Sequence, residues 1–371
     1  MLVDMAGRKY ELPRRKFAIA PAVVNLITGK FGWSTTSTAN GLFMPSDHTL
    51  TRILVIKHGA LGDIVQALDS FASLRAGNPD AHIALMTTPG FVSFATMMPW
   101  FDEVIADPRT GIFNLAAAWR IRRILRQDWS IMVDMQCSGR TKRYFTHFVM
   151  PATRWVGTAP GCSDRLPDFT GVNNRDRMMK TAEIAGGIAK NADMDWLMGD
   201  EASAGTPLLF TPSFADCEFP QAGRYAVLVP GCSLAKPQKR WPAERFAELA
   251  NALLARNLTV LLVGTDDDRT AVDAVLAVAA DAVDLCGKTN LVKLAQLLRG
   301  AAFVIGNDTG PMFLAAKTGA PSLMLMGPDT DPSMSAPTGL TVTWLQASPI
   351  AHITAKAALD ALEKLGLGPA A

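Results

Sequence analysis

AAFVIGNDTGPMFLAAK, from Ala301 to Lys317, is the most informative segment of this chain. An apolar run ends at Gly306, the polar residues of GNDTG follow, and Pro311 opens a second apolar run. This order predicts a β-strand, a tight loop and a helix with proline in its first turn. Such a loop brings backbone N–H groups, a carboxylate and a hydroxyl to the positive end of a helix dipole. The stretch therefore predicts a site for a phosphate attached to a polyhydroxylated group.

A second loop of this kind lies far away in the sequence, where KHGALGD runs from Lys57 to Asp63 after the apolar segment Arg52–Lys57. Asp63 comes at the start of the next helix, where its carboxylate can cap the free N–H groups. At the same point it can face a cleft and take a proton from an acceptor hydroxyl as a general base. The spacing alone leaves both roles open. Two such loops facing one cleft predict an enzyme that acts on a nucleotide sugar.

Two more loops follow predicted strands in the second half of the chain. PGCS ends at Ser233, and Lys236 and Lys239 come soon after it. A hydroxyl with a nearby lysine suits a pyrophosphate, although a solvated basic loop has the same composition. The acidic loop GTDDD contains Asp267 and Asp268. Its carboxylates can hold ribose hydroxyls or can favour the dipole of the following helix, and both interpretations stay open.

Basic residues form two clusters in the first half of the chain. A helix face that carries four arginines is usually solvated surface. If the helix predicted over residues 114–126 lines a cleft, the clusters would instead hold an anionic acceptor. Their members are Arg120, Arg122, Arg123 and Arg126 in the first cluster and Arg140, Lys142 and Arg143 in the second.

Strand-like and helix-like segments alternate in two series, which predicts an α/β protein with parallel sheets and helices on both faces. The first series runs from Arg52 to about Val156, with a further helix predicted over Met178–Ala189, and the second begins at Tyr225. Residues 199–223 lose this periodicity and are predicted to be the interdomain linker. We expect an extension over 1–48, one domain over 49–215, another over 220–350, and a C-terminal helix and tail over 351–371.

The composition fits a packed globular protein, since 49% of the 371 residues are hydrophobic and 19% are charged. A net charge of +2 gives no global attraction to nucleic acid, so we expect no nucleic-acid partner. The five cysteines are scattered, and no pair is spaced for zinc. A reducing cytosol is therefore expected, and neither a metal ion nor any other cofactor.

The N-terminal segment has a basic cluster over 13–16 and a short apolar run over 17–27, which superficially resemble a secretory signal. Pro21 interrupts the apolar run, and no stretch of about 18 apolar residues exists to span a membrane. Residues 1–48 are therefore predicted to be an appendage. It would make a peripheral contact with the inner face of the inner membrane or pack on the domain surface.

Taken in order, strand–GALGD–helix, PGCS…KRWP, GKTNL and GNDTGPM resemble the lipopolysaccharide heptosyltransferase family, glycosyltransferase family 9. The resemblance covers roughly residues 52–350. It implies a GT-B fold, in which two Rossmann-like doubly wound domains face a central cleft. It also implies inverting, metal-independent transfer of a sugar, typically heptose from an ADP-heptose donor, onto a lipopolysaccharide core or a related anionic glycan or glycolipid.

The resemblance also implies a role for each matching residue. Asp63 matches the family's catalytic base, and Asp308 would hold the donor sugar. The residues expected at the donor diphosphate are Ser233, Lys236, Lys239, Thr309 and Gly310. Those expected at the nucleoside are Asp267, Asp268 and Thr289. The residues expected at the acceptor come from the two basic clusters and not from the resemblance, and they are Arg120, Arg123, Arg140, Lys142 and Arg143.

The sequence departs from the family pattern at two points. Phe313 stands where the family usually has histidine, which removes one polar contact to the diphosphate or the sugar. The spacing from Ser233 to Lys239 is one residue longer than in the family, which makes Lys236 a rival phosphate ligand. The alternatives are a changed donor sugar, a GT-B sugar-nucleotide epimerase or hydrolase, and a sugar-nucleotide-binding paralogue without transferase activity. An NAD-dependent dehydrogenase is disfavoured, because the loop at 57–63 lacks the GxGxxG spacing.

Overall fold

The computed structural model of this chain describes residues 2–3, 9–10, 50–109, 114–198, 222–233, 235–339 and 341–366. The short strands β1 (Leu2–Val3) and β2 (Lys9–Tyr10) pair antiparallel within a separate unit, Met1–His48. The other described residues belong to the unit Thr49–Ala371. Most of the predicted appendage and nearly all of the predicted linker lie outside the described residues.

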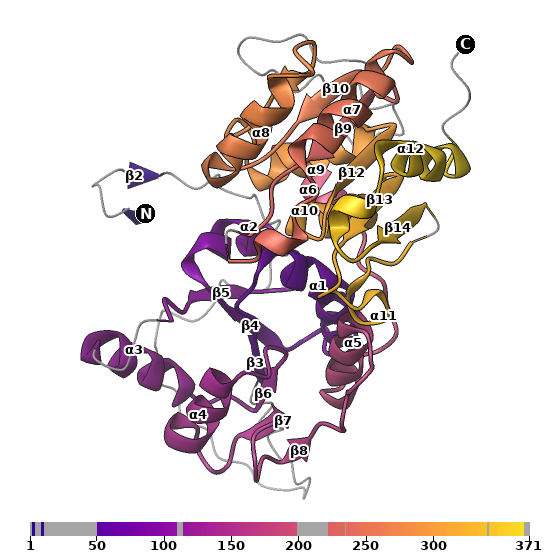
Figure 1. The fold of residues 1–371 in the computed structure, drawn as a ribbon. Helices are drawn as coiled ribbons and strands as arrows, with labels where there is room; N and C mark the ends of the chain where they lie inside the picture. Colours follow the sequence, from indigo (N-terminus) through magenta and orange to yellow (C-terminus); the bar gives the residue numbers. More distant parts are fainter. Residues whose placement is uncertain are drawn as a thin grey trace, which may run out of the picture. The chain divides into compact units, whose positions relative to one another are not determined.

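The first half of this unit is built on a six-stranded parallel sheet in the order β5-β4-β3-β6-β7-β8 (Figure 1). The first strand, β3, lies in the middle of the sheet. The next two strands, β4 and β5, lie toward one edge, and β6, β7 and β8 then follow toward the other edge. This is the strand order of a Rossmann fold. The strands are β3 (Arg52–Ile56), β4 (His82–Thr87), β5 (Glu103–Ala106), β6 (Ile131–Asp134), β7 (Arg154–Gly157) and β8 (Asp164–Arg165).

The second half repeats this plan in another six-stranded parallel sheet, ordered β11-β10-β9-β12-β13-β14. Figure 1 draws its strands in orange to yellow and those of the first sheet in indigo to magenta. The strands are β9 (Tyr225–Val229), β10 (Thr259–Leu262), β11 (Val283–Asp284), β12 (Phe303–Asn307), β13 (Ser322–Met326) and β14 (Val342–Gln346).

The helices of the first half are α1 (Leu61–Gly77), α2 (Val92–Thr96), α3 (Leu115–Leu125), α4 (Gly139–Phe148), α5 (Asn174–Ile184) and α6 (Asp195–Met198). Those of the second half are α7 (Ala243–Leu254), α8 (Arg269–Leu276), α9 (Leu291–Gly300), α10 (Gly310–Thr318), α11 (Pro332–Ser335) and α12 (Ala355–Lys364). The helix predicted over Met178–Ala189 was wrong at both ends. It ends at Ile184, and Gly186 has a positive φ of 93°, which suits glycine and terminates the helix.

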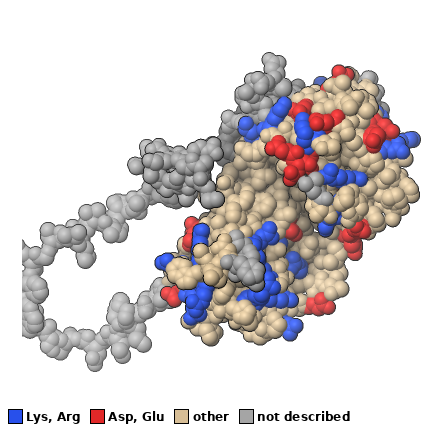
Figure 2. Space-filling view, turned by 60° about the vertical axis from the view of Figure 1, so that its left-hand side comes forward, with Lys and Arg blue, Asp and Glu red and all other residues tan. Residues whose placement is uncertain are grey.

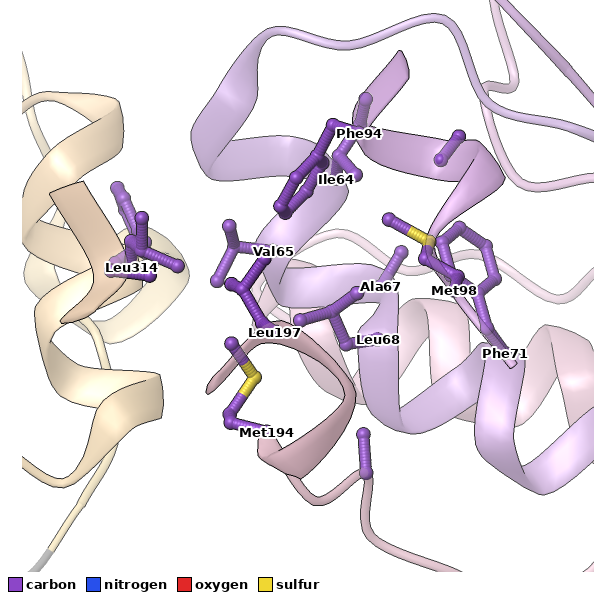
Figure 3. Packing of buried hydrophobic residues seen from close by; sticks show 14 of the residues in the cluster. Ile64, Val65, Ala67, Leu68, Phe71, Phe94, Met98, Met194, Leu197 and Leu314 are labelled. Carbon is purple, nitrogen blue, oxygen red and sulfur yellow. The ribbon is translucent and has the colours of Figure 1, made fainter. Parts of the chain in front are cut away.

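Alternating side chains of the central strands pack into separate clusters on the two faces of each sheet. In β3, Ile53 and Val55 join one cluster, whereas Leu54 and Ile56 join another that contains the buried residues of α3 and α4. The first of these clusters continues into the second half through α9 and α10. Figure 3 shows Leu314 of α10 opposite Val65 of α1 and Leu197 of α6. The helices α1 and α10 therefore join the two halves through an apolar contact.

A buried ion pair strengthens the same junction. Asp69 of α1 is almost fully buried and accepts hydrogen bonds from Lys317 of α10, from Arg175 of α5 at 2.9 Å and from the N–H of Ala192 at 2.8 Å. Burial alone would raise the pKa of Asp69, but the hydrogen bonds from Lys317, Ala192 and Arg175 outweigh it, so the pKa is lowered. The charged form of Asp69 is thus the form that holds α1 to α10.

We expect Asp69→Asn to lower the free energy of unfolding at pH 7 by about 3 kcal/mol, because it leaves Lys317 facing an uncharged partner. A carboxyl whose folded-state pKa is depressed stabilises the fold above its unfolded value, which is near 3.8. That stabilisation disappears as the pH falls through the lower folded value. Urea unfolding of both proteins from pH 7 to pH 3 should therefore show a constant difference that shrinks below about pH 4. A difference independent of pH would contradict the pairing.

Candidate active site

A cavity of about 790 Å³ lies at the junction of the two halves. Its walls in the second half come from the loops after β9, β10, β11 and β12, at the carboxyl ends of the strands, where doubly wound sheets bind their ligands. The first half contributes Ala60, Leu61, Gly90, Ser93, Phe94 and Met97. The predicted site residues that line the cavity are Ser233, Asp267, Asp268, Thr289, Thr309 and Gly310.

The first turns of three helices meet at this cavity. Ala60, Asn290 and Thr309 precede α1, α9 and α10, and each of them lines it. Asn290 caps α9 with its own side chain, whereas Thr309 makes no side-chain cap to α10. No side chain therefore caps the N–H of Gly310, whereas Pro311 has no N–H and that of Met312 bonds the carbonyl of Thr309; the helix dipole adds positive potential there. An anionic group is the ligand that such a point favours.

Two glycines allow α1 and α10 to approach each other at the cavity. A Cβ atom on Gly310 would lie 2.8 Å from Cβ of Leu61, and one on Gly62 would lie 2.8 Å from the ring of Phe313. Real Cβ contacts are not that short, so larger residues would push the helices apart. The loops GALGD and GNDTG, distant in the sequence, are thus brought into direct contact, as the sequence analysis expected of two sites facing one cleft.

Asp63 lies in the first turn of α1, and both roles that the sequence left open are compatible with its position. Its Oδ2 accepts the backbone N–H of Ala60 at 3.1 Å, which caps the helix. Its side chain is nevertheless 39% exposed, so the carboxylate can still receive a proton. Asp63 does not itself line the cavity, but Ala60 and Leu61 before it do. The loop is held in shape by Gly59, whose φ of 114° disfavours any larger residue.

Lys57 lies beneath Asp63, and the sequence analysis assigned it no role. Its side chain is 2% exposed, and its Nζ lies 3.9 Å from Oδ1 of Asp63. Burial lowers the pKa of Lys57, while the Asp63 carboxylate opposes that effect by favouring the ammonium form. The sequence did contain a signal for this burial. Lys57 directly follows an otherwise apolar strand, and its side chain is buried together with that strand.

Asp308, the aspartate of the GNDTG loop, forms a largely buried ion pair with Lys239. The Asp308 carboxylate also accepts a hydrogen bond from Oγ1 of Thr330 at 2.7 Å. Asn307, the preceding residue, accepts the N–H of Trp241 at 2.9 Å and donates to the carbonyl of Pro230 at 2.8 Å. Three motifs that are separate in the sequence, PGCS, KRWP and GNDTG, are thereby held together.

The two lysines expected at the diphosphate have different surroundings. Lys239 is committed to Asp308, whereas Lys236 is exposed and its backbone N–H bonds the carbonyl of Ser233. Neither lysine lines the cavity, and nor does Asp308. Ser233 does line it and is exposed. Lys236 is therefore the lysine whose charge is still available to a phosphate near Ser233.

The two predicted ribose ligands in the acidic loop after β10, Asp267 and Asp268, have different surroundings. Asp268 accepts both the N–H and the hydroxyl of Thr265 at 3.0 Å, and its side chain packs against Gly231. The carboxylate of Asp268 therefore caps the start of the helical turn Asp266–Asp268. Asp267 is exposed and lines the cavity. Of the two, Asp267 has the carboxylate that a ribose could reach.

Phe313 does not face the cavity. Its ring is buried in the core cluster that joins α1 to α10, and it contacts the position of Gly62. The phenylalanine therefore strengthens the junction of the two halves. The loss of a polar contact, which the sequence analysis expected from this departure, stays a prediction.

The basic residues expected at the acceptor lie on α3 and α4, and none of them lines the cavity. Figure 2 shows lysine and arginine side chains gathered over the lower part of the face in view. The guanidinium of Arg140 donates to the carbonyl of Arg109 at 2.8 Å. The others, Arg120, Arg123, Lys142 and Arg143, are exposed. Among the residues described, no cluster of His, Cys, Asp or Glu is arranged to hold a metal ion, and no helix is long and apolar enough to span a membrane.

Comparison with known proteins identifies similar sequences and structures. Residues 206–364 match the model of glycosyltransferase family 9 (heptosyltransferase). Lipooligosaccharide heptosyltransferase 2 of Haemophilus influenzae is 24% identical over 302 residues, which are 77% of this chain and 85% of the relative. A family 9 glycosyltransferase from Veillonella parvula superposes with a TM-score of 0.69 at 20% identity, covering 85% of this chain and 97% of the other.

A second solved structure is heptosyltransferase WaaC of E. coli with ADP-2-deoxy-2-fluoro heptose. It has a TM-score of 0.67 at 20% identity and covers 85% of this chain and 99% of WaaC. At such identities the structural likeness shows a shared fold. The prediction of a GT-B fold, with two Rossmann-like doubly wound domains and a cleft between them, is thereby confirmed.

Proposed function

Because this chain belongs to glycosyltransferase family 9, we propose that it transfers a heptose from ADP-heptose to a lipopolysaccharide core or a related anionic glycan. That it is a glycosyltransferase follows from the family, and the donor and acceptor are the finer part of the proposal. Two of the proteins it resembles support them. One is named a lipooligosaccharide heptosyltransferase, and the other was solved with a fluorinated ADP-heptose.

One observation carries the proposal: the first turn of α1, with Asp63, meets the GNDTG loop and the uncapped first turn of α10 at one cavity. The cavity thus has an anion-binding helix end on one side, and its other side includes Ala60 and Leu61 of the turn that carries the general-base candidate Asp63. A nucleoside diphosphate sugar has the matching chemistry, because its diphosphate is anionic and its anomeric carbon is the point of attack. The exposed Asp267 and the half-buried Thr289 line the same cavity and are the proposed nucleoside ligands.

The reaction is a single in-line displacement with inversion at the anomeric carbon. The acceptor hydroxyl attacks that carbon and transfers its proton to Asp63 as the new C–O bond forms. The bond from the anomeric carbon to the diphosphate breaks, and the nucleoside diphosphate leaves with the electron pair. Ser233, Lys236 and the N–H groups of Thr309 and Gly310 stabilise the growing charge, with no metal ion required. Fixed donors aimed at developing charge are usually the largest catalytic contribution.

The ion pair between Asp308 and Lys239 has a complementary role in this proposal. Asp308 accepts hydrogen bonds from the hydroxyls of the donor sugar, and Lys239 keeps that carboxylate charged and directed. The ammonium of Lys239 also adds positive potential next to the diphosphate. We further propose that the enzyme works at the inner face of the inner membrane, where a glycolipid acceptor is found, and that residues on α3 and α4 contribute to acceptor binding.

Thermal unfolding in the presence of nucleotides tests the donor class. ADP at about 100 times its Kd should stabilise the protein by about 2.7 kcal/mol, which corresponds to a rise of several degrees in Tm. UDP, GDP and dTDP at the same concentration should raise the Tm by much less. The variant Asp267→Ala should reduce the ADP shift, whereas Asp360→Ala on α12 should not. Equal shifts with all four nucleotides, or none with ADP, would contradict the assignment.

A further inference from the structure

The outer face of α3 carries two large apolar side chains in water. Leu115 is 77% exposed and Trp119 is 62% exposed, and their spacing of four residues places them one above the other on the helix. The opposite side of α3 is already used, because Ile121 and Leu125 are buried against the first sheet. The pair therefore contributes little to the core. An exposed tryptophan beside an exposed leucine needs another partner to bury its apolar surface.

Positive charge surrounds this apolar pair. Arg122 and Arg123 follow Trp119 by three and four residues, and the guanidinium of Arg123 lies 5.8 Å from the centre of the Trp119 ring. No acidic residue occurs within α3 or α4, although the whole chain is nearly balanced at +2. The basic residues of these helices and of the C-cap of α3 are Arg120, Arg122, Arg123, Arg126, Arg140, Lys142 and Arg143. We call this surface, together with Leu115 and Trp119, the α3–α4 face.

Most of these cations have no acidic partner within the described part of the chain. Some arginines elsewhere are paired, as Arg154 is with Asp164 and Arg269 with Asp284. On the α3–α4 face, by contrast, no ion pair joins Arg120, Arg122, Arg123, Arg126, Lys142 or Arg143 to a described carboxylate. A cluster of like charges costs free energy through self-repulsion unless it meets an anionic partner.

The position of the face separates it from the donor cavity. Helices α3 and α4 pack on the side of the first sheet that carries Leu54 and Ile56, whereas α1 and the cavity are associated with the other side. A phosphorylated sugar alone would use the arginines but would leave Leu115 and Trp119 in water. A surface that offers both anionic headgroups and an apolar layer uses all of them.

We propose that the α3–α4 face docks on an anionic phospholipid bilayer. Trp119 and Leu115 enter the interface between headgroups and acyl chains, and the arginines contact the headgroup phosphates. The chain would then rest on the bilayer through a short amphipathic helix of its first half. This contact is additional to the proposed transfer reaction and does not depend on it.

Co-sedimentation of the full chain with vesicles tests the proposal. Vesicles of phosphatidylcholine with 30% phosphatidylglycerol are compared with vesicles of phosphatidylcholine alone. Wild-type protein should bind the anionic vesicles and should be released as the salt concentration rises. Each change of Arg122, Arg123 or Arg126 to glutamine should lower the partition coefficient by about fivefold. Trp119→Ser together with Leu115→Ser should lower it by roughly tenfold or more.

Matched variants on the second half serve as controls. Trp344→Ser removes another exposed tryptophan, and Arg245→Gln removes a partly exposed arginine that is paired with Glu248, so neither should change the partition coefficient. Circular dichroism confirms that each variant is folded. The proposal is overturned if the α3 variants sediment like wild type, or if binding appears only when lipopolysaccharide is added to the vesicles. Because no donor is present, this result stands apart from any failure of the transferase assay.

Discussion

Asp63→Asn should lower the turnover number for sugar transfer by about 10³-fold, within the range that a general base contributes. Asparagine can still accept the N–H of Ala60, so the start of α1 is preserved. What it loses is the ability to take the proton from the acceptor hydroxyl. The substitution thus separates the two roles that the sequence left open, because only the base role disappears.

The measurement is steady-state transfer from ADP-heptose, with donor binding measured in parallel by calorimetry. The Kd for the donor should change little, and the loss should appear in kcat. Asp176→Asn provides the control, since Asp176 is an exposed aspartate in the first turn of α5 and has no part in the proposed reaction. Activity of the Asp63 variant close to that of the control would show that the carboxylate only caps the helix.

Lys239→Met should damage both stability and transfer. It leaves the largely buried carboxylate of Asp308 with Thr330 but without its cation, which should lower the free energy of unfolding by about 3 kcal/mol. It also removes positive potential next to the leaving diphosphate and frees the carboxylate that should hold the sugar. Loss of one fixed electrostatic contact costs about 3 kcal/mol of transition-state stabilisation, or roughly 10²-fold in kcat.

Lys317→Met is the matched control for the stability effect. Lys317 forms the other buried pair between a lysine and an aspartate, with Asp69, but it does so away from the donor cavity. The Lys317→Met variant should have a lower free energy of unfolding. At a temperature where both variants are folded, it should keep most of its rate of sugar transfer. Denaturant unfolding and initial rates measured side by side make the comparison. Equal loss of rate in the two variants would mean that Lys239 acts only through the fold.

The periodicity of the sequence predicted the central strands and the two loops that matter most. The central strands at residues 131–134, 225–229 and 322–326 lie within the two predicted series, because continuous apolar runs are typical of parallel strands buried on both faces. The edge strand β14 was not predicted, since its residues are only half-buried and carry no continuous apolar run. The helix after residue 174 was misplaced because polar residues fill its first turn.

The sequence predicted part of the candidate site. It did not predict which side chains of the site form ion pairs and hydrogen bonds with one another. GALGD and GNDTG were expected to meet, and the glycines in both loops make that contact sterically possible. Nothing local indicates that Lys239 pairs with Asp308, which is 69 residues away, or that Asp268 is occupied with Thr265 while Asp267 is exposed. The burial of Phe313 against α1 was equally invisible, because a family motif records residue types and not the direction in which a side chain points.

A crystal structure with an intact, non-transferable donor analogue would show whether the diphosphate binds at the start of α10 with its sugar directed at Asp63. The diphosphate should lie within hydrogen-bonding distance of the N–H groups of Thr309 and Gly310, with the anomeric carbon on the side of Asp63. The nucleoside should lie near Asp267 and Thr289. A diphosphate bound away from the start of α10, or a sugar whose anomeric carbon faces away from Asp63, would contradict the account.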